Sequence, residues 1–266
     1  MYHAFRPNPT SGDVISPQNF AEQLALFQKE GYHPITLQQF ENFVSRRAMV
    51  PPNALLLTFD NGYESFYQQA YPLLVRYRYP AVLFAIGSWL SGQAPAGIHP
   101  ISWAQAKQMV ASGLVTVQGQ TWNMHSGVMV SPTRSEAADI GLAFNLATHQ
   151  QETMQQYDQA VTADLQRAQS ALKLEIGQTA SAFAYPFGDY DPALISLLHA
   201  TGYQYLFAAK LGWGNLQGQS PNVLYRVNTG AYHVTPEGAI SAIHLVARDT
   251  ANDPGWQPPR QYIEVW

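Results

Sequence analysis

The residues of this chain that could carry out chemistry stand where apolar runs end. The run Leu55–Phe59 leads directly into Asp60, Asn61 and Gly62. In parallel α/β folds, catalytic and ligand-binding groups gather at the carboxyl ends of the strands. A carboxylate delivered there can act as a general base or bind a metal ion. The alternative is purely structural: a strand that ends in an Asx-type turn, with Gly62 at a positive φ, would show the same residues.

Three further segments could join Asp60. His3 stands close to the amino terminus, the segment Gln120–His125 follows the apolar run 114–117, and Tyr185–Gly188 follows another short run. Each has a structural explanation when taken alone: a core histidine, a loop cap or a tight turn. The carboxyl ends of the strands of a parallel barrel lie on one face, so all of these residues can converge there.

The positioning elements alternate along the chain. Helical spacing follows the cap at Ser16-Pro17, with a stop near Gly31, and another helix starts at Thr36. Pro72 should kink or shorten the helix expected over 65–78. The remaining helices are expected at 102–110, 152–173, 192–199 and 237–247, and strands at 55–59, 81–86, 114–117, 182–185, 203–207 and 223–227. This alternation predicts one parallel α/β domain over residues 1–266, and we expect a barrel because the strand count approaches seven.

The stretch 126–150 is rich in Ser, Thr and Ala and is expected to be an irregular surface insertion bordering a groove.

Composition narrows the class of ligand. The chain of 266 residues has a net charge of −4, only 12% charged residues and no basic run, which argues against nucleic acid. Its 15 Tyr and 6 Trp suit neutral sugars better than polyanions. The absence of Cys excludes disulfides, thiolate metal sites and thiol nucleophiles. No apolar run is long enough to span a membrane. The chain opens without a signal peptide, so an exported protein would have had its targeting segment removed.

Three motifs in order resemble the polysaccharide deacetylases, the NodB-homology or carbohydrate esterase 4 family. Thr58–Tyr63 resembles the family's T-F-D-D-G motif, Gly119–His125 resembles S-H-T-x-x-x-H, and Phe183–Gly188 resembles the third motif. The opening pair Tyr2-His3 is similar to the branch that acts on poly-β-1,6-N-acetylglucosamine of biofilms. The resemblance runs from about residue 1 to 230.

The resemblance implies a distorted (β/α)7 barrel and a divalent metal of the zinc class that polarises an acetamide and activates water. Asp60 would be the general base, His3 the acid and His125 a metal ligand. Asn61 and Gln120 occupy the other two ligand positions. The substrate would be a cell-surface or biofilm polysaccharide, and the protein would be extracellular. The expected sugar-binding residues are Tyr63, Trp122, Tyr185, Pro186, Phe187 and Trp213.

Two positions depart from the family pattern. Asn61 replaces a metal-binding carboxylate and Gln120 replaces a histidine, and neither amide supplies the charge or the imidazole nitrogen that zinc prefers. Loss of a group that only orients a metal ligand commonly weakens metal binding about 10- to 100-fold. Two changes at the ligands themselves should therefore weaken it about 10³-fold or more. A third departure is Ala184, which stands where many members carry an Arg that orients the base.

Three explanations stay open: a relative that keeps the groove for glycan binding as a pseudoenzyme, an enzyme with another metal or other ligands, and an engineered inactive variant. A further alternative is a two-carboxylate glycosidase that pairs Asp60 with Glu64 or Asp189, which requires carboxyls about 5–10 Å apart. A serine hydrolase is disfavoured because no G-x-S-x-G elbow occurs.

Overall fold

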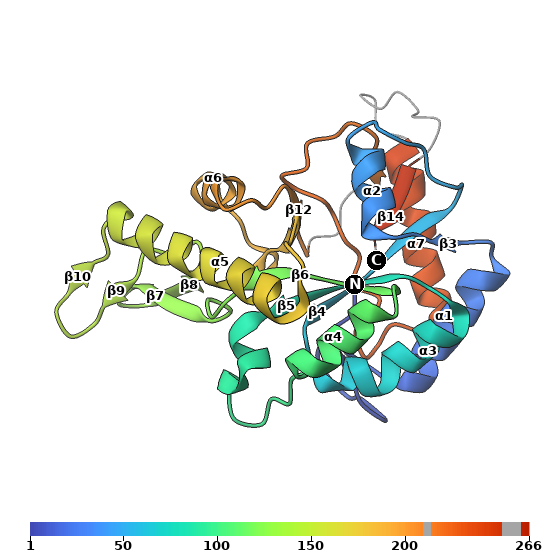
Figure 1. Cartoon of the computed structure of the whole chain (residues 1–266), viewed down its shortest axis with the longest axis horizontal. Coiled ribbons are helices and arrows are strands. Elements are labelled where there is room, and N and C mark those ends of the chain that lie inside the picture. The colour runs from blue at the N-terminus through green and yellow to red at the C-terminus, as the bar shows by residue number, and fades with distance from the viewer. Residues whose placement is uncertain (210–213, 252–261, 266) are drawn as a thin grey trace.

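A computed structural model describes residues 1–209, 214–251 and 262–265, with only the backbone described for 248–251 and 262–265 (Figure 1). The helices are α1 (Pro17–Lys29), α2 (Leu37–Val44), α3 (Tyr71–Tyr77), α4 (Trp103–Ala111), α5 (Met154–Ile176), α6 (Pro192–Ala200) and α7 (Pro236–Ala251). Two π-helical turns, η1 (Phe66–Ala70) and η2 (Trp89–Gln93), and one 3₁₀ turn, η3 (Pro186–Gly188), accompany them.

The main sheet curls into a distorted (β/α) barrel, as the sequence predicts. It runs in the order β12 (Tyr205–Phe207), β11 (Ala182–Ala184), β6 (Val115–Thr121), β5 (Ala81–Ile86), β4 (Ala54–Asn61), β14 (Tyr262–Val265) and β13 (Asn215–Leu216), and β3 (His33–Pro34) also pairs with β4. Every pairing in this sheet is parallel except that of β13 with β14. The strand ends that carry polar residues therefore share one rim.

Alternating residues of β4 pack on opposite faces of the sheet, and a core covers each face, which explains why this strand is largely apolar. Leu55, Leu57 and Phe59 pack in the larger core beneath α1, α4 and α5, whereas Leu56 packs on the other face, in the core that includes α2. Continuous apolar runs are typical of parallel strands covered on both faces. The same alternation places Asp60 on the Leu56 face, inside the curl of the sheet.

The helix boundaries follow from local chemistry. Ser16 caps α1 by accepting from the backbone N–H of Asn19, and Thr36 and Ser102 form capping boxes at α2 and α4. Pro72 does not end the helix. The helical backbone runs without a break through η1 into α3, and the wider turn of η1, in which the Tyr71 N–H donates to the Phe66 carbonyl, precedes the proline.

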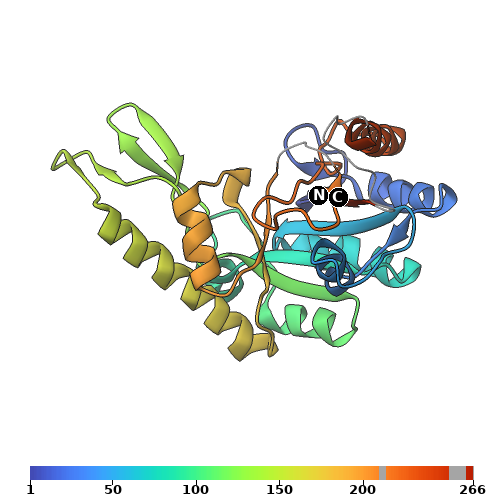
Figure 2. The same ribbon diagram turned by 90° about the horizontal axis from the view of Figure 1, so that it is seen from above.

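Two expectations need correction. The segment 126–150 is not irregular: it forms the antiparallel pairs β7 (Gly127–Ser131) with β8 (Arg134–Ala137) and β9 (Phe144–Asn145) with β10 (Gln150–Gln151). These pairs and α5 form an arm that projects from the sheet in both views (Figures 1 and 2).

The expected strand 223–227 reduces to one parallel bridge between Leu224 and Phe207. Two residues past this bridge, the Arg226 side chain reaches inward to the Asp60 carboxylate.

At the amino terminus, β1 (Ala4–Phe5) pairs with β2 (Val14–Ile15) in parallel, and Tyr2 bridges Phe59 of β4. The Tyr2 N–H donates to the Thr58 carbonyl, and the Asp60 N–H donates to the Tyr2 carbonyl. These bonds fix His3 beside Asp60. None of the helices in the described part of the chain has the length and apolar character needed to cross a bilayer.

Candidate active site

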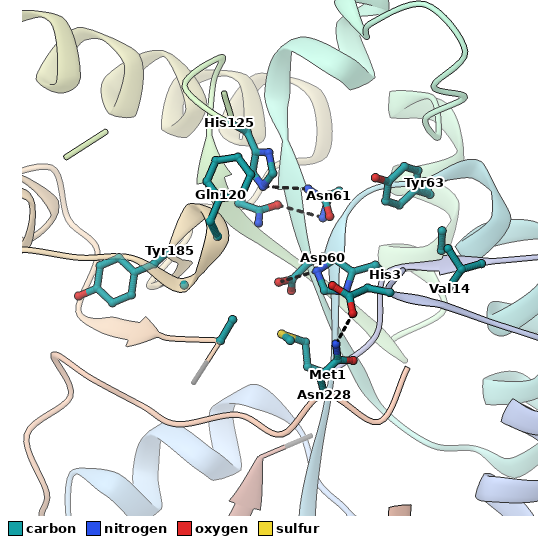
Figure 3. A pocket seen from close by; sticks show the side chains of 15 residues that line it. Met1, His3, Val14, Asp60, Asn61, Tyr63, Gln120, His125, Tyr185 and Asn228 are labelled. Carbon is teal, nitrogen blue, oxygen red and sulfur yellow. Dashed lines mark hydrogen bonds and ion pairs between the residues drawn. The ribbon is translucent and has the colours of Figure 1, made fainter. Parts of the chain in front are cut away.

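A cavity of about 470 Å³ opens at the rim where the strands end. Its floor and walls include most of the residues expected from the sequence: His3, Asp60, Asn61, Tyr63, Gln120, His125, Tyr185 and Phe187 (Figure 3). They come from four separate stretches of the chain, and parallel strands bring them together. We call this the site cavity.

Asp60 is almost fully buried and forms a bidentate ion pair with Arg226. Arg226 Nη1 and Nη2 donate to its two carboxylate oxygens at 2.6 and 2.9 Å, and Arg226 is itself buried. Burial alone would raise the pKa of Asp60, but the Arg226 charge and the nearby His3 outweigh it, and the pKa is lowered. Asp60 is therefore ionised at neutral pH.

Arg226 is the functional residue that sequence reasoning missed. Arg226 holds Asp60 from a part of the chain that lies outside the three motifs. The available signal was a single Arg within the apolar run Val223–Val227, since a buried cation requires a carboxylate or carbonyl partner. Its Nε also donates to the Ala208 carbonyl at 3.2 Å.

His3 lies beside the ion pair, with its Nε2 atom 3.8 Å from Asp60 Oδ2. Burial lowers the pKa of His3, although the Asp60 charge acts in the opposite direction. The imidazole is therefore neutral near pH 7. Its Nδ1 atom is buried and has no hydrogen-bond partner among the described residues.

The three expected ligand positions are joined by hydrogen bonds instead. Asn61 Nδ2 lies 3.1 Å from His125 Nε2, and Gln120 Oε1 accepts from the Asn61 backbone N–H at 2.9 Å. Burial lowers the pKa of His125, so this imidazole is also neutral. Asn61 has a φ of 73°, a conformation that Asn tolerates better than most residues.

This donor set does not fit a zinc-class ion. One imidazole nitrogen is engaged by an amide, and one amide oxygen is engaged by the backbone. Where side chains are described, no three His, Cys, Asp or Glu residues gather closely enough to hold a metal ion. Zinc sites in proteins without Cys are built from imidazole and carboxylate groups.

Phe187 is the exposed aromatic of the cavity. Its side chain is 57% exposed, and its ring lies 4.6 Å from that of His125. Its backbone has a φ of 57°, which is unfavourable for a bulky residue and is typical of functional sites. The turn therefore holds this ring over the cavity instead of packing it into the core.

Four predicted sugar contacts have different outcomes. Tyr63 and Tyr185 line the cavity on opposite sides (Figure 3), although the Tyr185 hydroxyl points away and donates to the Asn222 carbonyl at 2.7 Å. Pro186 is buried beneath the turn and does not line the cavity. Trp213 lies outside the described residues.

Trp122 was predicted to be a stacking wall, and the structure places it elsewhere. Its side chain is only 8% exposed, packs beside Gly87 and carries the Arg167 guanidinium 4.3 Å from its ring centre. The bond from its backbone N–H to Asp164 turns the chain away from the cavity at this point.

The carboxylates proposed for a glycosidase pair also do not meet Asp60 in the cavity. Glu64 lines a neighbouring cavity, and Asp189 ends η3 outside the lining. The segment 126–150 contributes no residue to the lining, so the expectation that it borders the groove is wrong for the site cavity.

The curled parallel sheet carries an aspartate, two histidines and the exposed Phe187 ring at its strand ends. The family model described as polysaccharide deacetylase matches residues 47–206. The chain belongs to the polysaccharide deacetylase family.

One relative and two solved structures are similar to this chain. The chain is 27% identical over 205 residues to the poly-β-1,6-N-acetyl-D-glucosamine N-deacetylase of Escherichia coli K12, which covers 73% of the chain but only 30% of that relative. It is similar to the structure of IcaB from Ammonifex degensii, with a TM-score of 0.72, 26% identity and coverage of 92% and 96% of the two chains. A de-N-acetylase from Aggregatibacter actinomycetemcomitans shares the fold, with a TM-score of 0.82, 23% identity and coverage of 92% and 97%.

Proposed function

We propose that this chain binds N-acetylglucosamine units of a poly-β-1,6-N-acetylglucosamine-type polysaccharide and does not deacetylate them by a metal-dependent route. The observation that carries the proposal is the hydrogen-bonded set of Asn61, Gln120 and His125 in place of a metal site. The family's chemistry is generally metal-dependent. A neutral set of amides with one engaged imidazole lacks the charge that would hold the ion.

The remaining groups of the cavity suit a sugar. Besides the carboxylates of Asp13 and Asp60, its walls combine neutral polar side chains with the exposed ring of Phe187 and the half-buried ring of Tyr63. Amide and imidazole groups can donate to and accept from an acetamide, and aromatic faces pack against the apolar face of a pyranose. Its volume of about 470 Å³ is in the usual range for a ligand pocket, roughly 300–1,000 Å³.

The retained Asp60 and His3 fit this proposal as binding groups. Asp60 is held in one orientation by Arg226, and the neutral His3 offers an uncharged ring nitrogen beside it. Both can hydrogen-bond sugar hydroxyls. We also place this protein outside the cell, as its resemblance to the deacetylases of biofilm polysaccharide implies.

Two measurements test the proposal. Calorimetry with β-1,6-linked N-acetylglucosamine oligomers should show binding, and an assay for released acetate should show no turnover with or without added Zn²⁺ or Co²⁺. Metal-dependent acetate release would overturn the pseudoenzyme part and favour a deacetylase with other ligands. Absence of heat with acetylated and deacetylated oligomers alike would overturn the glycan-binding part.

A further inference from the structure

A second cavity of about 360 Å³ adjoins the site cavity. The two cavities share the wall residues Ala4, Val14 and Tyr63, so they lie on either side of these residues. Figure 3 places Tyr63 and Val14 on the same side of the site cavity, opposite Tyr185. The second cavity therefore lies on the Tyr63 side of the site cavity, away from Tyr185.

The second cavity is built from fixed backbone. The loop before α4 is held against the segment after β4, because Glu64 N–H donates to the His99 carbonyl at 2.8 Å and Ile101 N–H donates to the Gly62 carbonyl at 2.9 Å. On the opposite wall, Phe5 N–H donates to Ser65 Oγ at 3.0 Å. The cavity is thus shaped without a ligand.

Three of its polar side chains, those of Glu64, Gln68 and His99, are free to bind. Gln68 and His99 are exposed at its edge and Glu64 is half-buried, and no side-chain hydrogen bond or ion pair of these three is found within the described residues. The wall shared with the site cavity is an aromatic ring held in place, since Tyr63 packs edge-on against Trp89 with ring centres 5.7 Å apart. An aromatic wall with an amide, a carboxylate and an imidazole is the lining expected of a hexosamine subsite.

From the shared walls and these free side chains we infer that the second cavity is a subsite for the adjacent hexosamine of the same polysaccharide chain. The inference rests on the function proposed for the site cavity. One sugar occupies the site cavity, Tyr63 separates the two units, and Gln68 with Glu64 hydrogen-bonds the neighbouring unit. Oligomers that fill both cavities should then bind more tightly than a monosaccharide.

The test compares N-acetylglucosamine with its β-1,6-linked dimer and trimer by calorimetry, in the unmodified chain and two variants. Gln68→Ala removes a lining amide, and Gln69→Ala is its matched control, an exposed neighbour on the same turn that does not line the cavity. The trimer should bind the unmodified chain at least about 10-fold more tightly than the monomer, since two or more new hydrogen bonds form. Gln68→Ala should reduce this advantage about 3- to 10-fold and leave monomer affinity unchanged, whereas Gln69→Ala should change neither.

The outcomes separate the two proposals. The subsite would be overturned, with the proposed function left standing, if monomer and trimer bound with equal affinity. The same conclusion would follow if the ratio of trimer to monomer affinity stayed unchanged in both Gln68→Ala and a Glu64→Gln,Gln68→Ala double variant. If no oligomer binds at all, the proposed function fails and the subsite falls with it. Circular dichroism of each variant confirms that a lost advantage is not a loss of fold.

Discussion

Arg226 donates two parallel hydrogen bonds to Asp60 from a segment 166 residues further along the chain. Both side chains are buried, and the Arg226 guanidinium also lies 5.4 Å from the centre of the Phe84 ring. The pair joins the carboxyl-terminal segment to the central strand β4 and fixes the orientation of Asp60. Bidentate geometry of this kind is available to Arg but not to Lys.

Breaking this pair from one side should destabilise the fold. Arg226→Met should lower the free energy of unfolding by about 3–5 kcal/mol, because it leaves the Asp60 charge buried and unpaired. The double variant Asp60→Asn,Arg226→Met should lose less than the sum of the two single variants. Urea unfolding of all four proteins measures this, with the exposed Arg76→Ala expected to change stability by less than about 0.5 kcal/mol. Strictly additive losses would show that the pair contributes no coupling.

Mild acid should destabilise the protein through its two site histidines. Burial lowers the pKa of both His3 and His125 below the ordinary value of about 6.5, so the unfolded chain binds protons more readily than the folded one. The free energy of unfolding should therefore be highest above about pH 6.5 and fall as the pH drops through that value towards the folded pKa values.

Each unit of pKa difference corresponds to about 1.4 kcal/mol. His3→Asn and His125→Gln should each flatten the slope, as measured by urea unfolding from pH 5 to 8. An unchanged slope in both variants would assign the titration to other groups.

Asp139 should oppose folding at neutral pH. It is buried, neither carboxylate oxygen accepts a hydrogen bond from another side chain or backbone in the described residues, and burial raises its pKa well above the ordinary value. The stabilisation from the protonated Asp139 is fully present below the pKa of this group in the unfolded chain, near 3.9. It is lost as the pH rises through the higher pKa of Asp139 in the folded protein. Asp139→Asn should therefore stabilise the protein at pH 8 by about 1–3 kcal/mol. Asp158→Asn on the exposed face of α5 is the control, and equal effects of the two would contradict the assignment.

Restoring the two family ligands should create metal binding. Asn61→Asp with Gln120→His would place a carboxylate and a second imidazole beside His125, whose Nε2 already lies 3.1 Å from the side chain of residue 61. Zinc at about 100 times its dissociation constant should raise the melting temperature of the double variant by about 5–10 °C and leave the unmodified chain unchanged. Each single variant should respond less. No metal response from the double variant would mean that these two positions do not correspond to the family's ligands.

Replacing Phe187 should lower oligosaccharide affinity without lowering the free energy of unfolding. Phe187→Gly removes the ring and relieves the positive φ, so stability should stay equal or rise by up to about 1 kcal/mol. Oligosaccharide affinity should fall about 3- to 10-fold with the loss of the aromatic platform. Phe187→Asn, which also tolerates positive φ, should behave similarly. Loss of stability together with binding would show that the ring is a core residue instead.

The sequence by itself determined the barrel, the order of its elements and the stretches that meet at its rim. Apolar runs that end in polar residues are a local pattern, and parallel strands necessarily place their carboxyl ends together. Asp60, His3, Asn61, Gln120 and His125 could therefore be assigned to one site before any coordinates. The motif resemblance added the family, and the family match over 47–206 confirms it.

Only the tertiary structure decided which side chains face the cavity and which partners they take. Trp122 and Phe187 both follow strand ends, yet one is buried beside Gly87 and the other is held out by a strained turn. The Asp60–Arg226 pair depends on a contact between segments 166 residues apart, and no local periodicity encodes such a contact. The hydrogen bond between Asn61 and His125 likewise depends on the distance between two strand ends, which the packing of the sheet sets.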